Sequence, residues 1–115
     1  MLGDLKMSDI ESITSQLLKF RDDRDWAQFH NPKDLAIALN IESSELLELF
    51  LWKHHADADL NKVKDELADV FAFAFLLADS YGFNIKEIVE EKILKNSIKY
   101  PIDKARSTSK KYNEL

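Results

Sequence analysis

The sequence predicts an all-α protein of one domain, and three of its properties support that fold class. The chain has 115 residues, a length that corresponds to a single domain with a core of its own. It contains only two glycines and two prolines, so it lacks the turn-rich composition of β-sandwiches and β-barrels. Its apolar residues, 45% of the total, are sufficient for a packed core and exclude a disordered or low-complexity chain. We therefore expect one domain over residues 1–115.

The first helix is predicted to begin just after Ser8, because Ser8 and Glu11 form a capping-box pattern. Apolar side chains then recur at helical spacing as far as Phe20, and the helix is expected to end near Arg24. Residues 1–7 precede this helix as a leader. Residues 25–30 contain two aromatic residues but show no period, so they are predicted to form a connector.

The second helix is predicted from Asn31 and Pro32, which supply an N-cap and a proline at the first helical position, to about Trp52. A polar connector, residues 53–61, leads to a third helix over residues 60–80. Gly82 is expected to end that helix, since glycine tolerates the left-handed backbone of a C-terminal cap.

The fourth helix follows a second capping pattern, Asn84 and Glu87, and runs to about Lys99, where Tyr100 and Pro101 stop it. Residues 102–115 form a polar, basic tail that is expected to be extended. Four helices of roughly 16–22 residues joined by short connectors predict a four-helix bundle.

The charge of the chain is negative overall and unevenly distributed. Sixteen Lys and Arg against twenty-one Asp and Glu leave a net charge of −5, which argues against a general nucleic-acid binder. Residues 92–115 hold seven of the basic residues and only two of the acidic ones. An acidic body with a basic end indicates a metal ion at one place and phosphate at another.

Several kinds of site and location are excluded by what the sequence lacks. It has no cysteine, which excludes disulfides, thiolate zinc sites and a cysteine nucleophile and fits a reducing compartment. It has no uncharged run of 18 residues, and its N-terminus lacks the basic start and apolar stretch of a secretion signal. We expect a cytoplasmic protein that binds neither membrane nor nucleic acid.

Four acidic residues form two pairs on the second and third helices. Glu42 and Glu45 share a helical arc with leucines, and Glu66 and Asp69 share theirs with valine and phenylalanine residues. If these two faces pack together, four carboxylates converge and repel one another unless a cation lies between them. Oxygen ligands without cysteine or histidine favour Mg²⁺, with Mn²⁺ possible. The alternative is that these acids are surface charges or intrahelical salt-bridge partners, because the same spacing recurs at Glu87 and Glu90.

Several aromatic and basic residues suggest that the protein binds a nucleotide. Trp26 and Trp52 flank the second helix, where they suit either stacking on a base or ordinary packing. Lys92, Asn96 and Lys99 share one face of the fourth helix, where they form either a phosphate-binding wall or a solvated stripe.

Taken in order, these motifs resemble the MazG-like all-α nucleoside triphosphate pyrophosphohydrolases, and more specifically their dCTP pyrophosphatase branch. The resemblance covers about residues 8–114 and rests on four segments of the sequence. They are RDWAQFH at 24–30, ESSELLELFLWK at 42–53, ELADV at 66–70 and KYP at 99–101. Many relatives have a second glutamate at the position of Ile41, and the pair Ser43–Ser44 often ends in glycine; both differences bear on base preference.

The resemblance implies a Mg²⁺-dependent conversion of a dNTP to dNMP and pyrophosphate, a role in nucleotide-pool house-cleaning, and assembly as a homodimer or homotetramer. It implies metal ligation by Glu42, Glu45, Glu66 and Asp69, with Glu45 or Glu42 as the catalytic carboxylate that orients water. Expected substrate-binding residues are Trp26, His30, Trp52, Lys53, Lys92, Asn96, Lys99 and Tyr100. The competing hypothesis is a catalytically silent helical module that binds a nucleotide or only dimerises.

A dimer or a dimer of dimers is also expected from the apolar residues themselves. The second and third helices carry apolar side chains around more than one face, as in the runs at 46–51 and 70–78. One protomer of this size is expected to be too small to cover them all.

Overall fold

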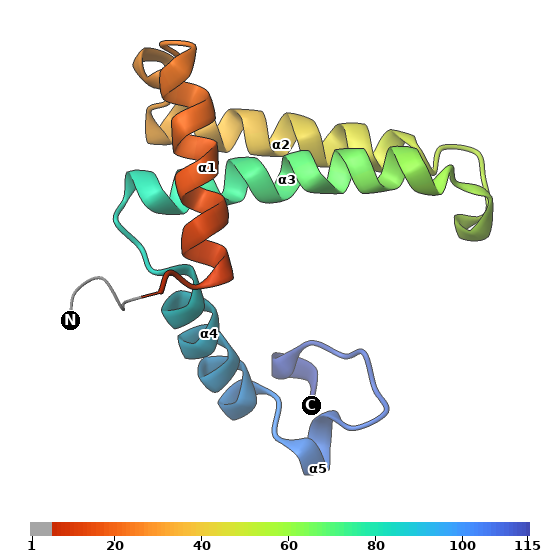
Figure 1. Cartoon of the computed structure of the whole chain (residues 1–115). Coiled ribbons are helices and arrows are strands. Elements are labelled where there is room, and N and C mark those ends of the chain that lie inside the picture. Colours follow the sequence, from red (N-terminus) through yellow and green to blue (C-terminus); the bar gives the residue numbers. More distant parts are fainter. Residues whose placement is uncertain (1–5) are drawn as a thin grey trace. The chain divides into compact units, whose positions relative to one another are not determined.

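The computed structural model describes residues 6–115, and these fall into two compact units that meet at Gly82 and Phe83 in the sequence (Figure 1). The leader expected at residues 1–7 therefore lies, over residues 1–5, outside the described residues. Within residues 6–115 all regular structure is helical, which confirms the all-α prediction. The first, second and fourth main helices begin at the residues that the capping patterns predicted.

Helix α1 spans Asp9–Asp23 and begins at the predicted cap. The Ser8 hydroxyl accepts a hydrogen bond from the Glu11 backbone N–H at 3.2 Å, which satisfies one of the free donors of the first turn. Asp25 follows the helix with a left-handed φ of 55°. The predicted connector then contains a short 3₁₀ helix over Ala27–Phe29, a turn too brief to leave a periodic signal in the sequence.

Helix α2 spans Pro32–Glu48, with the Asn31 side chain accepting a hydrogen bond from the Asp34 backbone N–H at 2.9 Å. It ends four residues before the predicted end at Trp52. The apolar run at residues 49–51 continues the helical spacing, but the backbone there forms successive i→i+3 turns, and Trp52 takes a left-handed φ of 59°. The predicted connector that follows contains a 3₁₀ turn at His55–Asp57.

Helix α3 spans Leu60–Ser80 and confirms the third predicted helix. The Asp59 carboxylate caps its start by accepting hydrogen bonds from the backbone N–H groups of Asn61 and Lys62. Gly82 has the expected left-handed φ, 70°, just after its end. Helix α3 lies alongside α2 in the opposite direction, and α1 crosses α3 (Figure 1). This pairing of α2 with α3 brings the two predicted acidic faces together.

The first unit has a small core. Among residues 6–115 the buried apolar residues are Leu35 on α2, Ala58 before α3, and Leu76 and Ala78 on α3. An apolar groove of about 400 Å³ opens between α1 and α3. It is lined by Ile13, Leu17, Ala68, Phe71, Ala72 and Phe75. Large apolar side chains on all three helices of this unit thus remain in contact with solvent.

The second unit contains α4, Ile85–Lys99, and a short helix α5, Ile102–Ala105. The Asn84 side chain accepts a hydrogen bond from the Glu87 backbone N–H at 3.0 Å, which confirms the second capping pattern. The tail was predicted to be extended, and this prediction is wrong. Pro101 initiates α5, and a 3₁₀ turn forms at Tyr112–Glu114. Polar composition alone did not reveal these local turns.

In residues 6–115 no helix by itself has the length and apolar character needed to cross a membrane; only α3 and α4 taken together meet the length and composition requirement.

Candidate functional site

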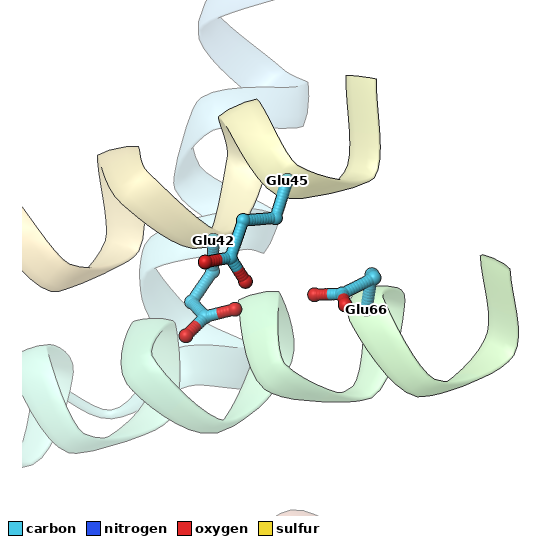
Figure 2. Close-up of side chains that lie close together, drawn as sticks. All are labelled: Glu42, Glu45 and Glu66. Atoms are coloured by element: carbon cyan, nitrogen blue, oxygen red, sulfur yellow. The ribbon is translucent and has the colours of Figure 1, made fainter. Parts of the chain in front are cut away.

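Three glutamate side chains converge between α2 and α3. Glu42 and Glu45 lie one turn apart on α2, and Glu66 faces them from α3 (Figure 2). One carboxylate oxygen from each lies within 4.8 Å of the other two. The i, i+3 spacing on α2 puts two carboxylates on the same side of the helix, and the packing of α2 against α3 supplies the third. The carboxylate cluster Glu42–Glu45–Glu66 is thus built by two elements.

Two oxygens of this carboxylate cluster have no partner. Glu42 Oε2 and Glu66 Oε2 are both buried and accept no hydrogen bond, whereas the Glu45 side chain is exposed. Among the described residues, the ion pairs join Lys19 to Asp23, Arg21 to Asp22 and Lys86 to Glu90. None of these cations neutralises the cluster. The alternative that these glutamates are salt-bridge partners therefore finds no support in the described residues.

The crowding changes the acidity of the cluster. Partial burial, followed by the hydrogen bond with Glu45 and by the negative charges around it, raises the pKa of Glu42 to about 7 from 4.5. Burial and the charge of Glu45 likewise raise the pKa of Glu66. Both shifts mean that the ionised carboxylates are unfavourable in the folded chain without a counter-charge.

Asp69, the fourth predicted ligand, lies one turn after Glu66 on α3 with an exposed side chain. It is not part of the group whose oxygens lie within 4.8 Å. Its charge nevertheless raises the pKa of both Glu42 and Glu66, so it adds to the negative potential of the same place.

The residues of the cluster fit a hard divalent cation. All the donor groups are carboxylates, the type that Mg²⁺ and Mn²⁺ prefer, and two of these groups each have a buried oxygen without a hydrogen-bond partner. A cation bound among these groups would offset their negative charge, which adds to the effect of burial in raising the pKa of Glu42.

His30 and Trp26 lie before α2 in different environments. The His30 ring contacts Phe73 of α3 edge to face, with ring centroids 6.4 Å apart, and its Nδ1 atom is buried without a hydrogen-bond partner. Burial, followed by the charge of Arg21, lowers the pKa of His30 and keeps its imidazole neutral at pH 7. Trp26 packs edge to face on Phe20 at 5.9 Å and is 45% exposed.

Trp52 and Lys53 lie in the turns after α2. The Trp52 side chain is 94% exposed, and its left-handed φ is uncommon for a bulky residue. Lys53 is also exposed, and its backbone N–H closes a turn on the Phe50 carbonyl at 3.1 Å. The Trp52 indole therefore lies outside the core of this protomer.

The predicted phosphate-side residues belong to the second unit. Lys92, Asn96 and Lys99 recur on one face of α4, and Tyr100 caps the C-terminal end of that helix. The Lys99 ammonium lies 4.9 Å from the centroid of the Tyr112 ring, and the Tyr100 ring meets Tyr112 edge to face at 6.2 Å. Tyr112 was not predicted as a site residue, because the sequence there shows only an aromatic residue after two lysines.

Comparisons with known proteins place these features in context. A family model described as the MazG-like family matches residues 37–115, which include the three clustered glutamates. Human dCTP pyrophosphatase 1 is 35% identical over 114 residues, an alignment that covers 92% of this chain and 67% of the human protein. The rat dCTP pyrophosphatase 1 is 32% identical over the same proportions. The structure superimposes on the crystal structure of a pyrophosphatase from Archaeoglobus fulgidus with a TM-score of 0.77 and 36% sequence identity. The superposition covers 84% of this chain and 96% of the archaeal chain.

Proposed function

The chain belongs to the MazG-like family, and we propose that it hydrolyses a deoxynucleoside triphosphate, dCTP or a dCTP-like nucleotide, to the monophosphate and pyrophosphate. The observation that carries this proposal is the carboxylate cluster, in which two buried glutamate oxygens lack partners. The homology to dCTP pyrophosphatases supplies the reaction type and the favoured base. Removal of surplus or non-standard nucleotides from the pool is the corresponding cellular role, which we place in the cytoplasm.

The metal is proposed to lie among Glu42, Glu45 and Glu66, with Asp69 beside them. Mg²⁺ is the favoured ion and Mn²⁺ the alternative. When bound, such an ion supplies the positive charge that phosphate oxygens require and lowers the pKa of water. Glu42 and Glu66 would hold the ion, and each of them has a buried oxygen without a hydrogen-bond partner.

The reaction adds a water oxygen to the α-phosphorus and breaks the bond from that phosphorus to the oxygen that bridges it to the β-phosphorus. We assign the orientation of this water to Glu45, because its side chain is the exposed member of the cluster, with Glu42 as the alternative. A carboxylate in this place accepts the proton that the attacking water releases.

Binding of the nucleotide is assigned by chemistry. We assign Trp26 and Trp52, with His30 and Lys53 in the adjoining segments, to the base, because both indoles are exposed. Trp26 precedes and Trp52 follows the 17-residue helix α2, which is about 25 Å long at 1.5 Å per residue, so within one protomer a base contacts only one of the two. Lys92, Asn96, Lys99 and Tyr100 offer two cations, an amide and a phenol to the phosphates. The exposure of Trp52 supports this assignment, since its indole lies outside the core of this protomer.

We also propose that the protein acts as a homodimer or a dimer of dimers. The apolar groove between α1 and α3 supports this, as do exposed side chains such as Leu47 and Phe71. Exposed apolar surface of this kind is typical of protein–protein contacts. Light scattering on the purified chain measures the assembly directly.

The central experiment is a pyrophosphate-release assay with a panel of dNTPs in Mg²⁺. We expect turnover that EDTA abolishes and that Glu42→Gln removes. Glu91→Gln, an exposed glutamate on α4 that is not part of the cluster, is the matched control and should retain activity. A folded protein that binds dCTP without releasing pyrophosphate would instead support the catalytically silent binding module.

A further inference from the structure

The C-terminal segment of the second unit folds back onto the end of α4. After Pro101 the chain forms α5 and then reverses at Ser107, which takes a left-handed φ of 64°. The Thr108 hydroxyl accepts a hydrogen bond from the Lys110 backbone N–H at 3.3 Å, and a 3₁₀ turn places Tyr112 against the residues that end α4. The segment that the sequence predicted to be an extended basic tail thus folds back against the C-terminal end of α4.

Tyr112 makes two contacts at that place. The Lys99 ammonium lies over the Tyr112 ring, 4.9 Å from the ring centroid, which is within the range of a cation–π interaction. The same ring meets Tyr100 edge to face, with centroids 6.2 Å apart and planes at 83°. Tyr112 therefore joins the last residue of α4 to its cap.

Fixing Lys99 has a physical consequence. A lysine side chain has large rotamer freedom, and a ligand that orders it must offset that entropy. An aromatic ring that already holds the ammonium lowers this cost, while the N–H donors that point away from the ring stay available for anionic oxygens. Tyr100 gains a fixed orientation from the same ring.

We propose that Tyr112 is a positioning residue of the phosphate-binding end of the nucleotide site, acting through Lys99 and Tyr100. This inference rests on the proposed function, which assigns those two residues to the phosphates. It makes the segment 106–114 part of the site and assigns a task to a residue outside the predicted set. Its readout is the affinity for a polyphosphate that has no base.

The test compares variants that keep a ring at position 112 with variants that lose it. Tyr112→Phe and Tyr112→Trp keep the ring, and Tyr112→Leu and Tyr112→Met remove it. Titration calorimetry with inorganic tripolyphosphate in Mg²⁺ measures phosphate affinity without turnover. We expect the ringless variants to bind roughly two- to tenfold more weakly, as the loss of an exposed cation–π contact and an aromatic pair predicts, and the ring-keeping variants to match the wild type.

A double-mutant cycle shows whether the effect passes through Lys99. In the Lys99→Ala background, Tyr112→Leu should weaken tripolyphosphate binding much less than in the wild type, because the partner of the ring is already gone. Lys95, one turn earlier on α4, is exposed and contacts no aromatic ring of residues 6–115, so it supplies the matched cycle. In the Lys95→Ala background, the effect of Tyr112→Leu should be unchanged.

The outcomes separate this inference from the function on which it rests. Equal tripolyphosphate affinity across all four variants, or additive effects of Lys99→Ala and Tyr112→Leu, would overturn the positioning role while pyrophosphate release by the wild type continued. Loss of folding in both ringless variants would show that Tyr112 is a core residue, and this too would overturn the inference. Absence of pyrophosphate release by the wild type would contradict the proposed function itself.

Discussion

Replacing Glu42 with glutamine removes the most strongly perturbed charge of the carboxylate cluster at nearly constant volume. Because burial raises the pKa of Glu42 from 4.5 to about 7, the folded chain binds this proton more tightly than the unfolded chain. Stability of the metal-free wild type should therefore fall as the pH rises from about 4.5 to about 7, and remain low above that range. Glu42→Gln should be free of that loss.

The size of the effect follows from the two pKa values. Each pKa unit corresponds to about 1.4 kcal/mol, so the difference sets an upper limit of about 3 kcal/mol. Glu42 is only partly buried, and solvent screening reduces such interactions, so we expect a gain of about 1–2 kcal/mol for Glu42→Gln at pH 8. For a chain of this length that gain raises the Tm by about 4–8 °C.

The assay is thermal unfolding by circular dichroism in EDTA, at pH 5 and pH 8, with Glu91→Gln as the control that leaves the cluster intact. The Tm difference between Glu42→Gln and the wild type should be small at pH 5 and large at pH 8, and the variant should have lost pyrophosphate release. A variant that is less stable than the wild type at pH 8, or one that turns over normally, would refute the account of the cluster as a repulsive, metal-requiring site.

Three further predictions follow from the same structure. Mg²⁺ at a hundredfold excess over its Kd should stabilise the wild type by about 2.7 kcal/mol, and Asp69→Asn should reduce this gain. Equal Tm values of the wild type in Mg²⁺ and in EDTA would contradict the metal site. Trp52→Ala should raise the KM for dCTP by roughly tenfold or more, because stacking contributes about 1–3 kcal/mol per base. The Tm should stay unchanged because the Trp52 side chain is 94% exposed, and a strongly lowered Tm would assign Trp52 to packing instead. Phe71→Glu in the apolar groove should disrupt assembly, measured by light scattering, whereas a wild-type protein that is already a monodisperse monomer at micromolar concentration would rule out the proposed interface.

The starts of the helices could be predicted because their determinants are local. Ser8, Asn31 and Asn84 each accept a hydrogen bond from a backbone N–H three residues later, so neighbouring residues decide each boundary. The end of α2 depended on more than its neighbours. Apolar spacing continues through Leu51, but the backbone leaves the helix at Leu49 and reaches a left-handed residue at Trp52, which no local pattern indicates.

The carboxylate cluster was visible in the sequence because helical spacing and apolar neighbours define which face each glutamate occupies. The place of Asp69, exposed and outside the group of three, depends on how α3 is rotated against α2, and spacing along one helix does not determine that rotation. Tyr112 was missed for a related reason. Its contacts depend on the reversal at Ser107, and a single non-glycine residue with positive φ leaves no signal in the sequence.

The different exposure of the two tryptophans gives the chain two separable optical reporters. Water relaxes around an excited indole and shifts its emission to longer wavelength, so Trp52, 94% exposed, should emit to the red of Trp26, which packs on Phe20. With no other tryptophan in the sequence, the red and blue sides of one emission band report on the loop after α2 and on the end of α1 respectively. Quenching by iodide should therefore act first on the red side, and the order in which the two sides change on adding a ligand records which of these places responds first.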